Sequence, residues 1–157
     1  MNDELYNAYS LLLDRTARRV KQYAQQQFKE MGFNITVDQW LVMKNLHEHP
    51  EMKQNELAEL LSKDNPTFTR IVDLLSKKGL ATRKVHPDDR RSFQLTLTAA
   101  GAKKVEQMKP KVKRVRLKAW DDLSEKDFNQ FKRILNTIYK NLAWGIFLAR
   151  FPLIKLN

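Results

Sequence analysis

Residues 63–79 (KDNPTFTRIVDLLSKKG) constrain this 157-residue chain most, because they encode both ends of a short helix. Asn65 is a favourable N-cap, Pro66 suits the first helical position, and Gly79 suits the left-handed residue after the last turn. Apolar side chains recur between them at spacings of three and four, which predicts one buried face. That face consists of Phe68, Ile71, Val72 and Leu75.

The opposite face of this predicted helix is polar. It carries Thr69, Arg70, Asp73 and Lys77, with Thr67 in the first turn. Hydroxyl and guanidinium groups on a rigid helix can reach base edges and phosphates in a DNA major groove. Taken alone, the stretch also fits an ordinary amphipathic surface helix. The neighbouring segments are therefore needed to distinguish this from a DNA-reading helix.

Those neighbouring segments predict a winged helix-turn-helix. A short apolar helix at residues 54–61 leads through a brief turn into the polar-faced helix, which is the helix-turn-helix arrangement. Beyond Gly79 the apolar pattern alternates in residues 81–86 and 92–97, which predicts two half-buried strands. The polar residues 87–91 join these strands, so a charged hairpin follows the helix-turn-helix as a wing.

Long amphipathic helices are predicted on both sides of this module. Residues 5–31 lack Gly and Pro, and Thr36 with Gln39 forms a capping box for a second helix. A strongly charged helix follows the wing at residues 99–120, and Pro110 is expected to kink or split it.

A final helix begins at the N-cap pair Ser124 and Asp127 and is apolar on one face. Apolar helices at both ends of so small a chain have little core of their own to cover, so we expect them to pair across a two-fold axis. Burial against the winged module within one chain is the alternative. The predicted fold is mainly α with a small β-hairpin wing. A winged helix-turn-helix DNA-binding domain spans residues 36–98, and a helical dimerisation region spans 1–35 and 99–157.

The net charge of +11 favours an anionic partner, such as nucleic acid, an anionic membrane surface or an acidic protein. Residues 99–120 hold eight Lys and Arg against one Glu. A sequence-neutral protein that binds DNA or an anionic membrane surface through this basic helix is therefore an alternative function. The simplest interpretation of the same run is a solvated helix face.

Other classes of function have little support in the sequence. The four glycines are scattered, and no phosphate loop, metalloprotease motif or nucleophile elbow is present, so we expect no enzyme. The chain has no Cys and only three His, so we expect no metal site and no cofactor. The first residues lack a signal peptide, and no apolar run approaches the roughly 20 residues that span a bilayer. We expect a soluble cytoplasmic protein with no membrane partner.

Six short stretches of the sequence resemble the multiple-antibiotic-resistance regulator (MarR) family of bacterial transcription factors. They agree with the family in order and spacing over about residues 36–101. The stretches are TVDQW at 36–40, ELA at 56–58, PTFTR at 66–70, KGL at 78–80, DDRRS at 88–92 and LT at 97–98.

The resemblance implies a homodimer that binds an inverted-repeat operator in double-stranded DNA. With the polar helix face, it assigns recognition-helix contacts to Asn65, Thr67, Thr69, Arg70 and Lys77. Wing contacts are assigned to Arg83, Lys84, His86, Asp89, Arg90, Arg91 and Ser92. By this similarity Arg91 enters the minor groove and Asp89 steadies it.

The resemblance also implies repression that a small ligand relieves, with the ligand bound near the junction of the two domains. We expect a small aromatic or amphipathic anion as this effector. Because the chain has no Cys, it cannot use the reactive thiol of the peroxide-sensing branch of the family.

Overall fold

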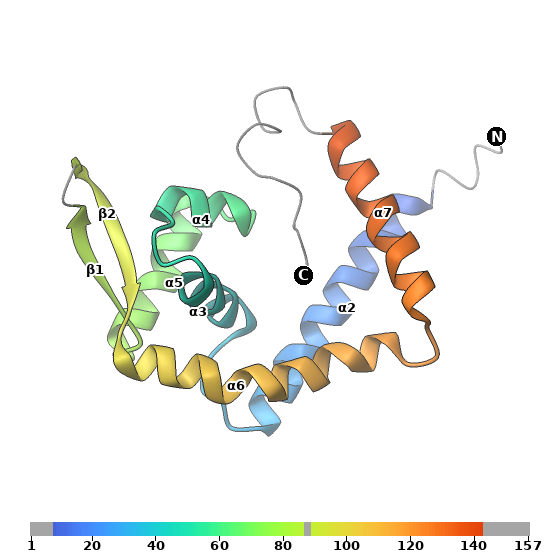
Figure 1. Ribbon diagram of the computed structural model, residues 1–157, viewed down its shortest axis with the longest axis horizontal. Helices are drawn as coiled ribbons and strands as arrows, with labels where there is room; N and C mark the ends of the chain where they lie inside the picture. Colours follow the sequence, from blue (N-terminus) through green and yellow to red (C-terminus); the bar gives the residue numbers. More distant parts are fainter. Residues whose placement is uncertain (1–7, 87–88, 143–157) are drawn as a thin grey trace. The chain divides into compact units, whose positions relative to one another are not determined.

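The computed structural model of the protein describes residues 8–86 and 89–142, without the side chains of residues 86–92. It divides into two units, Met1–Ala119 and Trp120–Asn157. The first unit contains α2 (Tyr9–Glu30), α3 (Val37–Glu48), α4 (Gln54–Leu60), α5 (Asn65–Lys77), β1 (Ala81–His86), β2 (Asp89–Leu97) and α6 (Ala99–Leu117) (Figure 1). A short 3-10 turn (Lys118–Trp120) follows, and the second unit contains α7 (Glu125–Leu142).

Helix α3 lies at the centre of the first unit, where it contacts α2, α5, α6 and β2 (Figure 1). Its Val42 and Met43 are completely buried, and α6 adds Val105 and Met108 to the same core. The apolar face predicted for α5 is confirmed, because all four of its predicted members are buried. One core therefore holds α5 against α3 and leaves its polar face outside.

The predicted hairpin is also confirmed. Strands β1 and β2 pair antiparallel, with Ala81 opposite Leu97 and Arg83 opposite Leu95. Ala81 and Leu95 are buried, so one side of the hairpin packs on the core while the other faces outward. The mainly α fold with a β-hairpin wing is thus the one that the sequence predicted.

The N-cap of α5 differs from the prediction. Asp64 caps the helix, accepting the backbone N–H of Thr67 on Oδ1 at 2.7 Å, and Asn65 is the first helical residue. The prediction of Asn65 was wrong because Asp and Asn cap helices about equally well and stand side by side here. Pro66 is tolerated one position later, because the backbone N–H that proline lacks would have no partner in the first turn of the helix.

The C-terminal end of α5 follows the prediction and packs against the start of α6. Gly79 has φ +66°, and Leu80 donates its N–H to the carbonyl of Leu75 at 3.0 Å, which completes a Schellman ending. Thr98 caps α6 and also donates its hydroxyl to the carbonyl of Gly79 at 2.6 Å. A Cβ on Gly101 would lie 2.0 Å from the Leu80 carbonyl oxygen, so only glycine fits this contact.

We expected Pro110 to kink or split helix α6. It does not split it, because α6 is continuous from Ala99 to Leu117. Met108 and Val112, on either side of the proline, are both buried in the core. Their packing holds the helix together where Pro110 removes one backbone hydrogen bond. The regular helix ends at Leu117 rather than at Trp120.

The second unit is built around the N-terminus of α7. Ser124 and Asp127 form the predicted cap, with the Ser124 backbone N–H donating to Asp127 Oδ2 at 2.8 Å. The ring of Trp120 packs edge-on against those of Phe128 and Phe131, with centroids 5.0 and 5.4 Å away. No residue of α7 is buried. Across the described residues of both units, no helix is long and apolar enough to cross a membrane.

Candidate nucleic-acid interface

The polar face of α5 is the first part of the candidate interface. Arg70, Asp73 and Lys77 are exposed along the helix, and Thr69 is half-buried beside them. Thr67 is exposed in the first turn, where its hydroxyl donates to Asp64 Oδ2 at 3.1 Å and can still accept a hydrogen bond. The structure thus leaves the predicted recognition residues Asn65, Thr67, Arg70 and Lys77 exposed, with Thr69 half-buried.

The wing is attached to this helix through Arg83. Its Nη1 lies 3.5 Å from Asp73 Oδ1 on α5, and its guanidinium stacks over the ring of Phe93 at 5.6 Å. Among the described residues, its Nε and Nη2 are buried without a hydrogen-bond partner. Arg83 therefore fixes the hairpin to α5, while its predicted contact with DNA remains a prediction.

The other wing residues divide into two groups. Lys84 is exposed on β1, opposite Gln94 of β2. The remaining predicted wing side chains lie outside the described ones, namely those of His86, Asp89, Arg90, Arg91 and Ser92. The backbone of the hairpin carries them, with His86 opposite Asp89.

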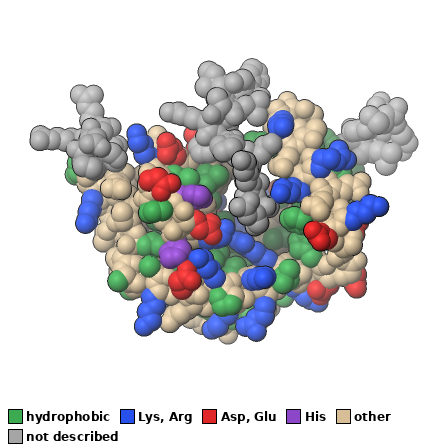
Figure 2. Space-filling model, in the orientation of Figure 1, with side chains coloured by type: hydrophobic (Ala, Val, Ile, Leu, Met, Phe, Trp, Pro, Cys, Tyr) green, Lys and Arg blue, Asp and Glu red, His purple; other side chains and the backbone are tan. Residues whose placement is uncertain are grey.

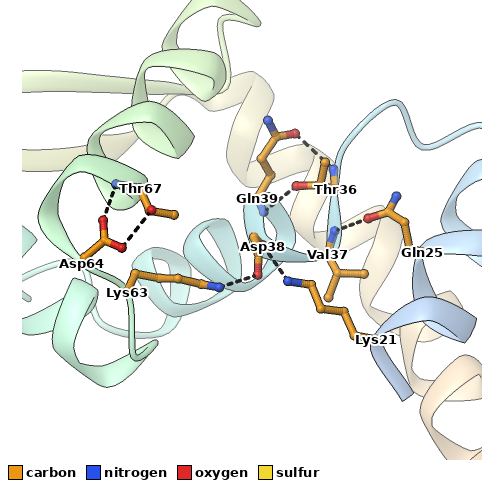
Figure 3. A network of polar contacts seen from close by, with 9 residues as sticks. All are labelled: Lys21, Gln25, Thr36, Val37, Asp38, Gln39, Lys63, Asp64 and Thr67. Carbon is orange, nitrogen blue, oxygen red and sulfur yellow. Dashed lines mark hydrogen bonds and ion pairs between the residues drawn. The ribbon is translucent and has the colours of Figure 1, made fainter. Parts of the chain in front are cut away.

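Two lysines that flank α5 bind to the N-terminal end of α3. Before the helix, Lys63 Nζ lies 3.2 Å from Asp38 Oδ1 (Figure 3). After the helix, Lys78 Nζ donates to the carbonyl of Asn34 at 2.6 Å and to Oε1 of the buried Gln39 at 3.2 Å. Both ends of α5 are therefore held by the same region.

The sequence did not predict these contacts. In residues 36–40 it indicated a capping box and a resemblance to the MarR family. That box is present, with the Thr36 hydroxyl accepting the N–H of Gln39 at 3.1 Å. Gln39 Oε1 accepts from Thr36 as well as from Lys78, so one buried amide serves both α3 and the end of α5. Only the fold brings Lys78 to it, 39 residues along the chain.

Helix α2 reaches the same region from the other side. Gln25 Oε1 accepts the N–H of Val37 at 2.9 Å, and Lys21 Nζ donates to Asp38 Oδ2 at 2.8 Å (Figure 3). Burial raises the pKa of the Asp38 carboxyl, but hydrogen bonds and positive charge from Lys21 and Lys63 outweigh it, so this pKa lies below its ordinary value of 3.8. Asp38 is therefore charged at neutral pH.

A groove with a volume of about 740 Å³ lies beside this network. Its lining comes from the α2 side chains between Gln22 and Lys29, from the loop between α2 and α3, and from Lys78. Glutamines and two lysines line the groove together with Phe28 and Ile35, so its lining has both polar and apolar residues. The described residues contain no cluster of three or more His, Asp or Glu that could hold a metal.

Helix α6 carries a second set of basic side chains. Lys103, Lys113, Arg114 and Arg116 are exposed. Lys and Arg side chains gather along the lower part of the face shown in Figure 2, where Figure 1 places α6. Not every cation on α6 is available, because Lys109 pairs with Glu106 at 2.8 Å.

Residues 35–93 match the MarR family, which covers α3 through most of the hairpin. The chain is similar to Staphylococcus aureus MepR in a complex with DNA, with 29% identity and a TM-score of 0.76 over 85% of this chain and 98% of that one. It is also similar to S. aureus MepR in its DNA-binding conformation, with 28% identity and a TM-score of 0.73 over 86% and 98%. A mutant MarR from E. coli complexed with operator DNA shares the fold, at 22% identity and a TM-score of 0.76 over 90% and 97%.

Proposed function

Because the chain belongs to the MarR family, we propose that it is a homodimeric repressor that reads an inverted-repeat operator and is released by a small ligand. The family assignment makes it a DNA-binding transcriptional regulator and not an enzyme, as the sequence predicted. We place the protein in the cytoplasm, where its DNA would be.

One observation carries the proposal: α5 buries one face completely and presents hydroxyl, guanidinium and ammonium groups on the other. Phe68 and Leu75 are 1% and 0% exposed, whereas Arg70 and Lys77 face outward. A rigid helix with this outer face fits a major groove, in which Arg can bind guanine and hydroxyls can bind several bases. The MepR complex with DNA supports the same assignment.

The first test selects bound sequences from a random DNA pool with the purified protein. We expect enrichment of an inverted repeat whose half-sites lie about one helical turn apart, because a two-fold protein meets two-fold DNA. Excess random DNA should leave this complex intact. Binding that depends on salt but enriches no sequence would contradict the proposal and support the sequence-neutral alternative.

The second test separates the helix from the wing. Arg70→Ala should cost about 1 to 3 kcal/mol on the best site and flatten the preference at one or two base pairs. Arg91→Ala should instead weaken sites with a narrow A·T-rich flank and spare discrimination at the centre. Asp89→Ala should partly reproduce Arg91→Ala. A folded Arg91→Ala protein that binds every operator as well as wild type would end the wing hypothesis.

We infer the dimer from apolar side chains that the single chain leaves exposed. Helix α2 exposes Tyr9, Leu12 and Val20, and α7 exposes Phe131 and Ile134, each by 40% or more. Contiguous apolar faces of this kind are typical of protein interfaces. Sedimentation should give a dimer at micromolar concentration, and a stable monomer that still binds DNA tightly would contradict this.

We propose that the groove beside α2 holds the ligand, and that this ligand is a small aromatic or amphipathic anion. Lys78 lines this groove and also holds Asn34 and Gln39 at the end of α5. An anion that takes the ammonium of Lys78 would loosen this end of the recognition helix. Benzoic and phenolic acids should therefore release the operator from wild type, while Lys29→Met protein, with an intact α5 contact, should respond more weakly. Absence of both release and thermal shift would contradict the proposal.

The exposed cations of α6 favour the sequence-neutral alternative. Replacing Lys113, Arg114 and Arg116 with Gln measures their share. If they bind DNA, the salt dependence of affinity should become flatter by about one unit for each lost phosphate contact. An unchanged slope would show that they are solvated.

A further inference from the structure

The carboxylate of Asp38 joins two elements to α3. It lies in the first turn of α3 and accepts Lys21 of α2 on Oδ2 at 2.8 Å and Lys63 on Oδ1 at 3.2 Å (Figure 3). Lys63 directly precedes Asp64, the N-cap of α5. A single carboxylate therefore connects α2 with the residue that leads into the recognition helix.

Of the two contacts that Asp38 makes, the one with Lys63 is less exposed to solvent than the one with Lys21. The side chains of Asp38 and Lys63 are 24% and 22% exposed, whereas that of Lys21 is 53% exposed. Partly buried charges are screened by salt less than exposed ones, and removing one partner leaves the other without compensation. The contact with Lys63 should therefore matter more than the contact with Lys21.

We propose that Asp38 is a positioning residue for DNA reading, which holds Lys63 and thereby fixes the N-terminal end of α5. This rests on the proposed function, in which α5 reads DNA. Lys63 is then bound by the protein and does not contact a phosphate, although a cation beside a recognition helix would ordinarily be assigned to the DNA backbone.

Only a few contacts separate Asp38 from the residues that are proposed to face DNA. Lys63 is bonded to Asp64, and the Asp64 carboxylate accepts both the backbone N–H and the hydroxyl of Thr67 (Figure 3). Movement of Lys63 therefore moves the first turn of α5, which carries Thr67 and leads to Arg70. The other end of the helix is held separately by Lys78, so loss of Asp38 should tilt α5 rather than release it.

The test compares Asp38→Asn, Lys63→Met and the double variant in operator binding at several salt concentrations. Each single change should weaken operator affinity by about tenfold, and the double variant should be no worse than Asp38→Asn, because Asp38→Asn already removes the contact with Lys63. Neither should alter the salt slope. Asp38→Glu, which keeps the carboxylate, should bind more tightly than Asp38→Asn. If Lys63→Met lowers the slope by about one unit and Asp38→Asn leaves affinity unchanged, Lys63 contacts a phosphate and the proposal is overturned.

Lys21→Met is the matched control, because it removes the exposed partner of the same carboxylate and should cost less affinity than Lys63→Met. An equal or greater loss of operator affinity in Lys21→Met would contradict the proposal that Asp38 acts mainly through Lys63.

Amide hydrogen exchange in the free protein gives a readout that needs no DNA. Asp38→Asn should speed exchange at Phe68, Thr69 and Arg70 relative to Leu75 and Ser76. If wild type binds no operator, the proposed function fails, and the exchange pattern still decides whether Asp38 fixes the start of α5. Unchanged exchange at both ends of the helix would overturn the proposal.

Discussion

Helices α5 and α7 have the same sequence pattern and opposite surroundings. Both carry apolar side chains at spacings of three and four. In α5, Phe68, Ile71, Val72 and Leu75 are all buried, whereas α7 buries no residue and exposes Phe131 by 44% and Ile134 by 40%. Helical spacing therefore shows that a face needs covering, but not what covers it.

The difference follows from what each helix finds within its own chain. The face of α5 meets α3, α4 and β1 in a common core, so its position is fixed by one copy of the protein. The small aromatic cluster of Trp120, Phe128 and Phe131 covers only the start of α7. Among the described residues, the rest of that face is not buried, and the proposed dimer would cover it with a second copy. Substitutions on the apolar face of α5 should therefore lower folding stability, whereas those on the apolar face of α7 should weaken dimerisation.

The largest effect is expected for Phe68→Ala, which removes a large side chain that is 1% exposed. Truncation of a buried Phe should cost about 3 to 5 kcal/mol of folding free energy, through lost burial and the cavity left behind. Urea unfolding should measure this. Leu74→Ala on the same helix, where the side chain is 38% exposed, is the control and should cost far less. Similar losses for both would show that α5 is not packed as described.

Gly101→Ala should have the next largest effect on folding. The added methyl group would lie 2.0 Å from the Leu80 carbonyl oxygen, so α6 must move away from the end of α5. Overpacking of this kind costs about 1 to 3 kcal/mol. Gly32→Ala is a useful comparison, because its Cβ would meet nothing within 4 Å and its cost would come from φ +67° alone. Wild-type stability of Gly101→Ala would disprove the close approach.

Ile134→Asp on α7 should act on association rather than on folding of the first unit. A charge in an apolar interface is unfavourable in both copies, so we expect the dimer dissociation constant to rise at least about tenfold. Sedimentation measures this, while circular dichroism should show that the helices remain. Thr137→Asp, elsewhere on the same helix, tests whether any added charge has this effect. A dimer of unchanged strength would assign the exposed face of α7 to something other than self-association.

The same contrast explains how far the sequence could predict the fold. Caps and turns are local, so Thr36, Gly79, Ser124 and the hairpin were identified from neighbouring residues. The sequence predicted Asn65 as the N-cap, but Asp64 is the N-cap in the structure, because the two adjacent residues cap helices about equally well. The continuity of α6 at Pro110 could not be predicted, because the buried neighbours that hold the helix together are known only from tertiary packing.

The candidate site was predictable only in part, for the same reason. Helical spacing predicts which side of α5 is buried and which side is outside, and this prediction is confirmed. The contacts of Arg83 with Asp73 and of Lys78 with Gln39 join different elements of the fold, so no local pattern indicates them. Whether a cation faces DNA or the protein depends on such distant partners.

The smallest expected effect concerns pH and the start of α5. The pKa of Asp38 is lower in the folded protein than its ordinary 3.8, so its contribution to stability is fully present above that value. This contribution is lost as the pH falls through the folded-state pKa. Asp38→Asn should therefore be less stable than wild type at neutral pH, and the difference should shrink as the pH falls below 3.8.

Urea unfolding of both proteins between pH 3 and 7 measures this difference. Asp127→Asn at the start of α7 is the comparison, because hydrogen bonds from Ser124 also lower the pKa of Asp127 there. Asp127 is fully exposed, whereas the side chain of Asp38 is 24% exposed and contacts two lysines, so Asp38→Asn should show the larger change in unfolding free energy with pH. A stability difference between wild type and Asp38→Asn that stays constant from pH 7 to pH 3 would show that the Asp38 charge does not hold the start of α5.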